Sequence, residues 1–132
     1  MFDGLTKVLN RHGIELPPDY FLTEPYADDA GDVVGYDMMR KLLKLNPLPD
    51  GVFCHNDPIA SGAMKAILDA GLRIPEDIAI IGCGNVRYSD CLRVPLSTID
   101  QNSAAIGERA AGLALTLLQS KTPVRPETIL LE

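Results

Sequence analysis

The sequence has few basic residues, no tryptophan and no long apolar run. Lys and Arg number 12 against 18 Asp and Glu, which gives a formal net charge of −6. Contacts to a nucleic-acid backbone need clustered Lys and Arg, so this composition argues against DNA binding by this chain itself. No run approaches the roughly 18 apolar residues of a membrane helix, and the N-terminal residues do not resemble a signal peptide. We therefore expect a cytoplasmic protein that does not enter a membrane.

The chain is also poor in cysteine and histidine, with three Cys and two His. An odd number of cysteines without a secretory signal indicates small buried residues rather than disulfides. Neither C-x-x-C nor H-x-x-x-H spacing occurs, so we expect no metal site. Ser61 lies outside any G-x-S-x-G elbow, and no histidine is spaced as its partner. We expect no catalytic residue, no cofactor and no enzymatic activity.

Residues 49–84 predict a complete βαβ unit. Residues 52–54 form a short apolar run that stops at a polar segment, as a buried parallel strand does where it leaves a sheet. A helix follows, with Asp57 as its predicted N-cap and Gly71 as its left-handed stop. Residues 78–81 predict the second buried strand. The right-handed crossover rule makes the two strands parallel, with the helix across them.

Polar residues stand where each of these strands ends. In a parallel sheet, ligands sit outside the carboxyl ends of the strands. The residues at these ends are His55, Asn56, Asp57, Cys83, Gly84 and Asn85. We therefore expect a ligand at this edge of the sheet.

The flanking residues extend this pattern. Before the βαβ unit, residues 5–12 predict a helix that Gly13 ends, with His12 in its last turn, and residues 20–23 predict a short strand. The next helix carries the stripe Val34, Met38, Leu42 and Leu45, with Gly35 and Met39 beside it and Asp28 or Asp29 as its cap. After the unit, residues 95–99 predict a strand. A last helix, 103–120, is capped by Asn102 or Ser103, and residues 128–131 are a candidate final strand. The fold class is therefore α/β, with a doubly wound, mostly parallel open sheet.

Two motifs resemble a known family. They are P-D-x-V-F-x-x-N-D-x-x-A-x-G-A-x-x-A-I-x-x-A-G-L-R-I-P-E-D-I-x-I-I-G and P-L-S-T-I-x-Q-N. Together they resemble the effector-binding domain of lactose/galactose-repressor (LacI/GalR) transcription regulators. The resemblance implies a periplasmic-binding-protein-like fold, in which two lobes close around a small ligand. By that comparison residues 1–102 are the second lobe without its first strand, and residues 103–132 are a crossover helix and strand for an absent first lobe.

The resemblance implies which residues face the ligand. Asn56 matches an Asn that hydrogen-bonds a sugar or purine effector, while Asp57 matches an Asp that caps the helix. Gln101 matches a Gln at the lobe crossing that contacts either the ligand or the hinge. The ligand-binding candidates are therefore Asn56, His55, Gln101 and Asn85, although His55 also fits a solvated loop residue.

Two departures from the family remove charged anchors. Cys83 and Gly84 occupy the positions where the family usually has an aromatic residue and then an Asp that takes two ligand hydroxyls. Met1 occupies the position of a family Arg. The resemblance thus implies a ligand edge that has lost both of its charged contacts in this lobe.

The resembling regulators form dimers through the helix after N-D and the loop after I-G. The matching residues are Ser61, Met64, Lys65, Leu68, Tyr88, Cys91 and Leu92. Met64, Leu68 and Leu92 lie off the stripe that faces the sheet, so a monomer would leave them as an apolar patch in water. We therefore expect a homodimer.

The family's second lobe has a central strand before the first helix, and this chain lacks it. We expect the gap to be closed, either by direct pairing of the flanking strands or by residues 128–131 of this chain or a neighbour, because unpaired buried backbone groups are costly.

We interpret the chain as the effector-binding and dimerising part of a LacI-type regulator, whose absent N-terminal helix-turn-helix reads DNA. A periplasmic sugar-binding protein of a transporter shares the fold and stays open as the alternative.

Overall fold

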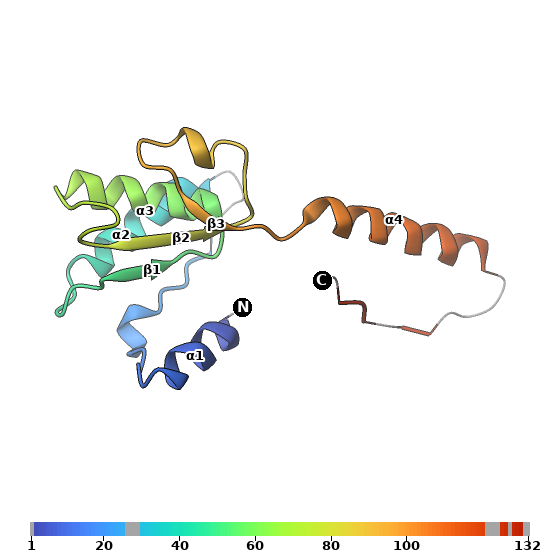
Figure 1. Cartoon of the computed structure of the whole chain (residues 1–132), viewed down its shortest axis with the longest axis horizontal. Helices are drawn as coiled ribbons and strands as arrows, with labels where there is room; N and C mark the ends of the chain where they lie inside the picture. The colour runs from blue at the N-terminus through green and yellow to red at the C-terminus, as the bar shows by residue number, and fades with distance from the viewer. Residues whose placement is uncertain (1, 26–29, 121–124, 127, 131–132) are drawn as a thin grey trace.

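The computed structural model describes residues 2–25, 30–120, 125–126 and 128–130. Figure 1 shows the helices and strands, which follow one another along the chain as α1 (Phe2–Arg11), α2 (Gly31–Leu42), β1 (Gly51–Phe53), α3 (Asp57–Asp69), β2 (Ala79–Cys83), β3 (Ser97–Ile99) and α4 (Ser103–Gln119). Short 3-10 turns occupy Pro18–Tyr20 and Ser89–Cys91. Helices α1 and α3 both end where predicted, at Gly13 and Gly71, which adopt positive φ angles of 70° and 76°.

The strands form one parallel sheet in the order β1-β2-β3. Gly51 is paired with Ala79, and Ile81 with Ser97. Helices α2 and α3 lie on one side of the sheet, with α3 against it and α2 against α3 (Figure 1). The predicted α/β fold with a central βαβ unit is therefore confirmed.

Glycines allow α2 and α3 to approach each other closely. A Cβ atom on Gly35 would lie 2.1 Å from the Ile59 carbonyl oxygen, and one on Gly62 would lie 1.8 Å from the Asp32 carbonyl oxygen. This contact turns α2 away from the predicted stripe. Its buried residues are Gly31, Gly35, Met39 and Leu42, whereas Val34 and Met38 are only half-buried. The stripe was wrong at Val34 and Met38, whereas Leu42 is buried as predicted, because hydrophobicity selects large side chains over glycines at a close helix crossing.

The core between these layers is small and aliphatic. Its members are Met39, Leu42, Cys54, Ala60, Ala63, Met64, Ala66, Ile67, Ile78, Ile80 and Leu96. The other face of the sheet is less covered, since Ile81 and Ile99 remain 37% and 48% exposed. The central helix is thus enclosed on two sides, while the sheet is enclosed on one.

The strand predicted at residues 20–23 is absent. The chain there forms the turn Pro18–Tyr20 and then runs on without strand pairing. The Tyr20 hydroxyl donates to the Pro47 carbonyl at 2.5 Å, and Leu22 packs against the core. Aromatic and branched residues favour a strand only when a neighbouring strand is in place, and these side chains find other partners.

The expected closure of the sheet is not found within the described residues. No described segment pairs with the outer edge of β1, and residues 128–130 are not a strand. Leu131, the last residue of that candidate strand, lies outside the described residues. The expectation was therefore wrong for this chain on its own, and pairing with a neighbouring copy stays a prediction.

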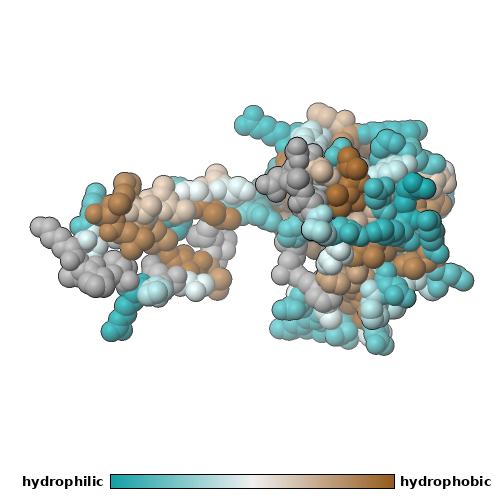
Figure 2. Space-filling model, turned by 180° about the vertical axis from the view of Figure 1, so that it is seen from behind, coloured by the Kyte–Doolittle hydropathy of each residue, from teal (hydrophilic) through white to brown (hydrophobic). Residues whose placement is uncertain are grey.

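Helix α4 confirms the predicted last helix but makes few contacts. It extends away from the sheet, and none of its residues is buried (Figure 1). Figure 2 shows brown, hydrophobic residues along this extension. In α4, Leu117 and Leu118 are 56% and 83% exposed. Within the described residues, no helix has the length and apolar character needed to cross a membrane.

The predicted helix caps need correction. Asn102 precedes α4 in a left-handed conformation, and neither the predicted Asn102 nor Ser103 supplies a side-chain cap. Asp28 and Asp29 lie outside the described residues, and Ala30 occupies the N-cap position of α2.

The close helix crossing can be tested at Gly62. We expect Gly62→Ala to lower the free energy of unfolding by ~1–3 kcal/mol, because the new Cβ atom overlaps the α2 backbone. Gly107→Ala is the matched control, since nothing lies within 4 Å of its Cβ position in α4. It should be neutral or stabilising by up to ~1 kcal/mol. Urea unfolding followed by circular dichroism measures both, and equal stabilities for the two variants would contradict the crossing.

Candidate functional site

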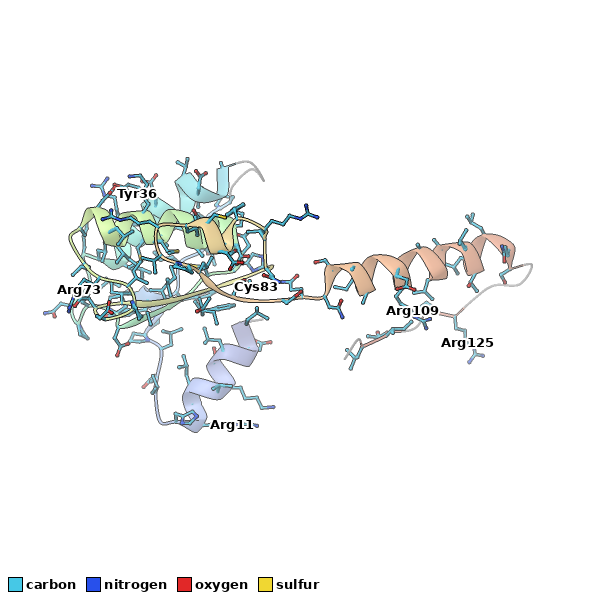
Figure 3. All side chains as sticks on the ribbon, turned by 45° about the horizontal axis from the view of Figure 1, so that its top comes forward. Arg11, Tyr36, Arg73, Cys83, Arg109 and Arg125 are labelled. Carbon is cyan, nitrogen blue, oxygen red and sulfur yellow. The ribbon has the colours of Figure 1, made fainter. Side chains whose placement is uncertain are left out.

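The predicted ligand-binding residues gather at the carboxyl edge of the sheet. His55, Asn56 and Asp57 follow β1, Gly84 and Asn85 follow β2, and Asp100 and Gln101 follow β3. Because the strands are parallel, these segments end at the same edge, beside the link to α4. Figure 3 shows Cys83, the last residue of β2, at this place. We call these residues the ligand edge.

Asp57 is completely buried and accepts hydrogen bonds from two other segments. Its Oδ1 accepts from the Thr98 hydroxyl at 2.6 Å, and its Oδ2 accepts from the Val86 N–H at 2.9 Å. The Ser89 hydroxyl lies 3.5 Å from the same Oδ2. A Cβ atom on Gly82 would lie 2.2 Å from Oδ1, so this carboxylate needs a glycine opposite it. Asp57 therefore joins α3, the loop after β2, and β3.

The helix cap is Asn56, not Asp57. Asn56 has an extended backbone, and its Oδ1 accepts from the Ile59 N–H at 2.9 Å, as an N-cap side chain does. Asp57 is already in the first turn, from which its side chain turns back toward β2 and β3. Both Asn and Asp are good N-caps, so the sequence alone favoured the wrong one. Asn56 is half-buried, and its predicted contact with a ligand stays a prediction.

Asn85 is held by its neighbours on β3. Its backbone N–H donates to the Thr98 hydroxyl at 3.2 Å, and its side-chain amide donates to Asp100 Oδ2 at 3.0 Å. The Asn102 N–H donates to the other Asp100 oxygen at 2.7 Å. These two donors, the Asn102 backbone first, hold the pKa of Asp100 below its usual range. Thr98 and Asp100 were missed by the sequence analysis, although polar residues at the end of the third strand are the signal that marks them.

Gln101 and His55 have different surroundings. The Gln101 side-chain amide donates to Cys83 Sγ at 2.8 Å, which holds it against the end of β2. His55 is exposed at the end of β1. The sequence left two alternatives for each of these residues. Gln101 contacts Cys83 of its own lobe, and the exposure of His55 fits a solvated loop residue.

The three cysteines form no disulfide and differ in their burial. Cys54 and Cys83 are buried as predicted, while Cys91 is exposed because the turn Ser89–Cys91 directs Ser89 inward. Burial, and to a lesser extent the nearby Asp57 carboxylate, raises the pKa of Cys54 to about 12. Within the described residues, no group of three or more His, Cys, Asp or Glu side chains could hold a metal ion.

The predicted dimer surface needs one correction. Met64 is only 3% exposed and belongs to the core cluster, so it cannot form part of an exposed patch. Leu92 is half-buried and packs against the core. Lys65 pairs with Asp69 at 2.5 Å and lies 4.9 Å from the centre of the Tyr36 ring. The half-buried residues Ser61 and Leu68 and the exposed residues Lys65, Tyr88 and Cys91 keep the dimer prediction open.

Comparison with known proteins identifies the family. A family model for the periplasmic binding protein-like domain matches residues 1–132. The chain belongs to this family. It is 37% identical over 124 residues to the HTH-type transcriptional repressor PurR of Pasteurella multocida, covering 94% of this chain and 36% of that protein. The PurR repressor of Mannheimia succiniciproducens is 36% identical, with 97% of this chain and 37% of the relative covered.

Solved structures agree with this assignment. A LacI-family regulatory protein from Chloroflexus aggregans matches with a TM-score of 0.80 and 28% identity, over 92% of this chain and 43% of that chain. A LacI-family regulator from Lactobacillus casei with bound sucrose matches with a TM-score of 0.73 and 25% identity, over 95% and 46%. The resemblance to LacI-type regulators and the periplasmic-binding-protein-like fold are thus confirmed. This member of the family spans little more than a third of the curated relatives it matches.

The Asp57 contacts can be tested by Asp57→Asn. The variant keeps the shape, but its amide nitrogen would face the Val86 or Thr98 donor, so we expect a loss of ~1.5–3 kcal/mol in the free energy of unfolding. Asp69→Asn is the control, because Asp69 is an exposed partner of Lys65 and should cost under ~1 kcal/mol. Urea unfolding at neutral pH compares the two. Equal, small losses would mean that relief of the buried charge outweighs the lost hydrogen bonds.

Proposed function

We propose that this chain is the effector-binding and dimerising portion of a cytoplasmic LacI-type transcriptional regulator, without catalytic activity. Its effector is a sugar or a purine-type compound, and it controls DNA binding by an N-terminal helix-turn-helix in the whole protein. The observation that carries the proposal is the ligand edge, where Asn56, Asn85 and Gln101 gather in a chain whose relatives are HTH-type repressors.

The chemistry of the ligand edge fits a neutral, hydroxyl-rich or heterocyclic ligand. Asn and Gln side chains each carry a donor and an acceptor, as do sugar hydroxyls, and purine rings present both along their edges. A sugar is supported by structural relatives bound to sucrose and, in the regulator CelR, to cellobiose. Gly84 adds no side chain, and its φ of 129° would strain any replacement. Met1, the other position of a lost anchor, lies outside the described residues.

A periplasmic sugar-binding protein of a transporter remains the second candidate, because the family model covers the shared domain. The curated relatives named here are repressors, which favours the regulator. The coding sequence upstream of Met1 discriminates the two: a helix-turn-helix segment supports the regulator, and a secretory signal peptide supports the transporter.

Ligand binding by this chain alone should be weak. A pocket normally surrounds 70–90% of a small ligand, and two missing charge-assisted contacts cost ~3–6 kcal/mol, or two to four decades of affinity. We therefore expect no calorimetric signal with sucrose, cellobiose, glucose or inosine at ~1 mM. A dissociation constant tighter than ~10 μM would contradict this estimate and indicate a cleft completed by a second copy.

Weak binding should still be visible by NMR. At ~50 mM sugar or ~20 mM inosine, we expect amide shifts at Asn56, Asn85 and Gln101 with one of these ligands. Asn56→Asp is the sharp variant, since it keeps a helix cap and removes the amide donor, and it should abolish the shifts. If no ligand perturbs the edge, the proposed effector classes are wrong.

The dimer can be tested by light scattering. We expect a dimeric mass at ~100 μM, because Leu68 and Tyr88 would otherwise contribute to an apolar patch, and a stable interface needs ~1,600 Å². Tyr88, which is 44% exposed, gives the variant Tyr88→Glu, which should yield monomers. Leu118→Glu on α4 is the control and should stay dimeric. A monomeric parent would contradict the dimer. Dissociation by the α4 variant only would mean that the interface lies on α4 instead.

A further inference from the structure

A continuous chain of hydrogen bonds runs from the buried Asp57 to the start of α4. Asp57 accepts from the Thr98 hydroxyl, and the same hydroxyl oxygen accepts from the Asn85 N–H. The Asn85 side chain donates to Asp100, which also accepts from the Asn102 N–H. We call these residues the polar relay. It connects the N-terminus of α3, the loop after β2, the end of β3 and the residue that precedes α4.

The polar relay holds two residues in an uncommon backbone conformation. Asn85 and Asn102 have φ angles of 51° and 52°, in the left-handed region, which Asn adopts mainly where its side chain or its neighbours supply local hydrogen bonds. If Asp100 served only to turn the chain into α4, its hydrogen bond from the Asn102 N–H would be sufficient. Its second oxygen instead accepts a hydrogen bond from the side chain of Asn85, which lies in the loop after β2. The relay therefore joins two segments that a local turn would leave independent.

The relay also lies where packing is weakest. Helix α4 has no buried residue, so side-chain packing does not fix its direction. The described contacts that tie its base to the sheet are those of residues 100–102, which are the Asp100 bonds to Asn85 and Asn102 and the bond from Gln101 to Cys83. A shift of Asn85 therefore acts on Asp100, which is also bound to Asn102, the residue that precedes α4.

We propose that Thr98 and Asp100 are positioning residues of the ligand edge, which fix Asn85 and couple it to the first turn of α4. A ligand that engages the Asn85 amide competes with Asp100 for its donors and so changes the start of α4. The role of the ligand rests on the proposed function, whereas the coupling is a property of the chain by itself.

The coupling can be measured without a ligand by acid titration in NMR. The two donors favour the charged form of Asp100, so its pKa is lowered in the folded state. The hydrogen bonds to charged Asp100 are thus fully formed above the ordinary pKa of an Asp. They are lost as the pH falls through the lowered pKa of Asp100. The Asn85 side-chain and Asn102 backbone signals should shift together, with one midpoint. The ionisable neighbours at this edge are His55 after β1, Asp57 on α3, reached through Thr98, and Cys83 on β2. Helix α4 has no acidic or basic residue in its first turn.

Thr98→Val is the decisive variant, because it removes the hydroxyl of the relay without changing the side-chain shape. We expect the Asp100 midpoint to return toward its ordinary value and the Asn102 amide to exchange roughly 3- to 10-fold faster. Thr116→Val removes a hydroxyl that bonds only within α4, to the Gly112 carbonyl, and should change neither quantity. Asp100→Asn should abolish the shared titration.

Several results would overturn the coupling. Separate midpoints for Asn85 and Asn102, or a Thr98→Val protein that loses stability while the Asp100 titration is unchanged, would reduce Thr98 to a structural role. With ~50 mM sucrose or cellobiose, a shift at Asn85 without one at Asn102 would refute the coupling and leave the proposed function standing. A shared titration with no ligand response would support the coupling and count against the proposed function.

Discussion

The Asp57 carboxylate is buried and takes part in none of the ion pairs among the described residues, and the arrangement of the ligand edge depends on how it is satisfied. A buried charge is costly unless hydrogen bonds replace its water, and here backbone and hydroxyl donors from the loop after β2 and from β3 do so. Meeting this requirement fixes β3 beside β2, brings the loop at Val86 inward and demands a glycine at position 82. The same carboxylate contributes to the raised pKa of Cys54. One side chain at the start of α3 thus organises all three strand ends.

The second constraint is the close contact between α2 and α3. Gly35 and Gly62 bring the two backbones together, and α2 adds Met39 and Leu42 to the core. The apolar side chains that remain exposed lie elsewhere, on the uncovered face of the sheet at Ile81 and Ile99 and along α4. The described residues therefore combine one well-packed layer with apolar surfaces that have no partner among them. Such surfaces are typical of a segment that corresponds to about a third of its relatives.

The ligand edge differs from the family pattern in how it carries charge. Gly84 stands where the resemblance implies an Asp, and the atom nearest to its Cβ position is Asp57 Oδ2 at 3.6 Å, while Asp100 follows β3 and is bound to Asn85. Asn85, the residue after Gly84, is held in place by the Thr98 hydroxyl and the Asp100 carboxylate.

The sequence by itself determined the features that depend on neighbouring residues. The apolar run before Asp57, the helix stop at Gly71 and the parallel pairing of β1 with β2 all follow from local patterns and a single handedness rule, and the structure confirms them. Only the tertiary structure decided that Asn56 is the cap, that Met64 is buried and that residues 20–23 do not form a strand. Each of these depends on groups distant in the sequence: the Thr98 hydroxyl donates to Asp57, Met64 packs in a core built by several elements, and the Pro47 carbonyl binds Tyr20. Local propensities cannot specify such partners, because these contacts form only once the chain has brought distant residues together.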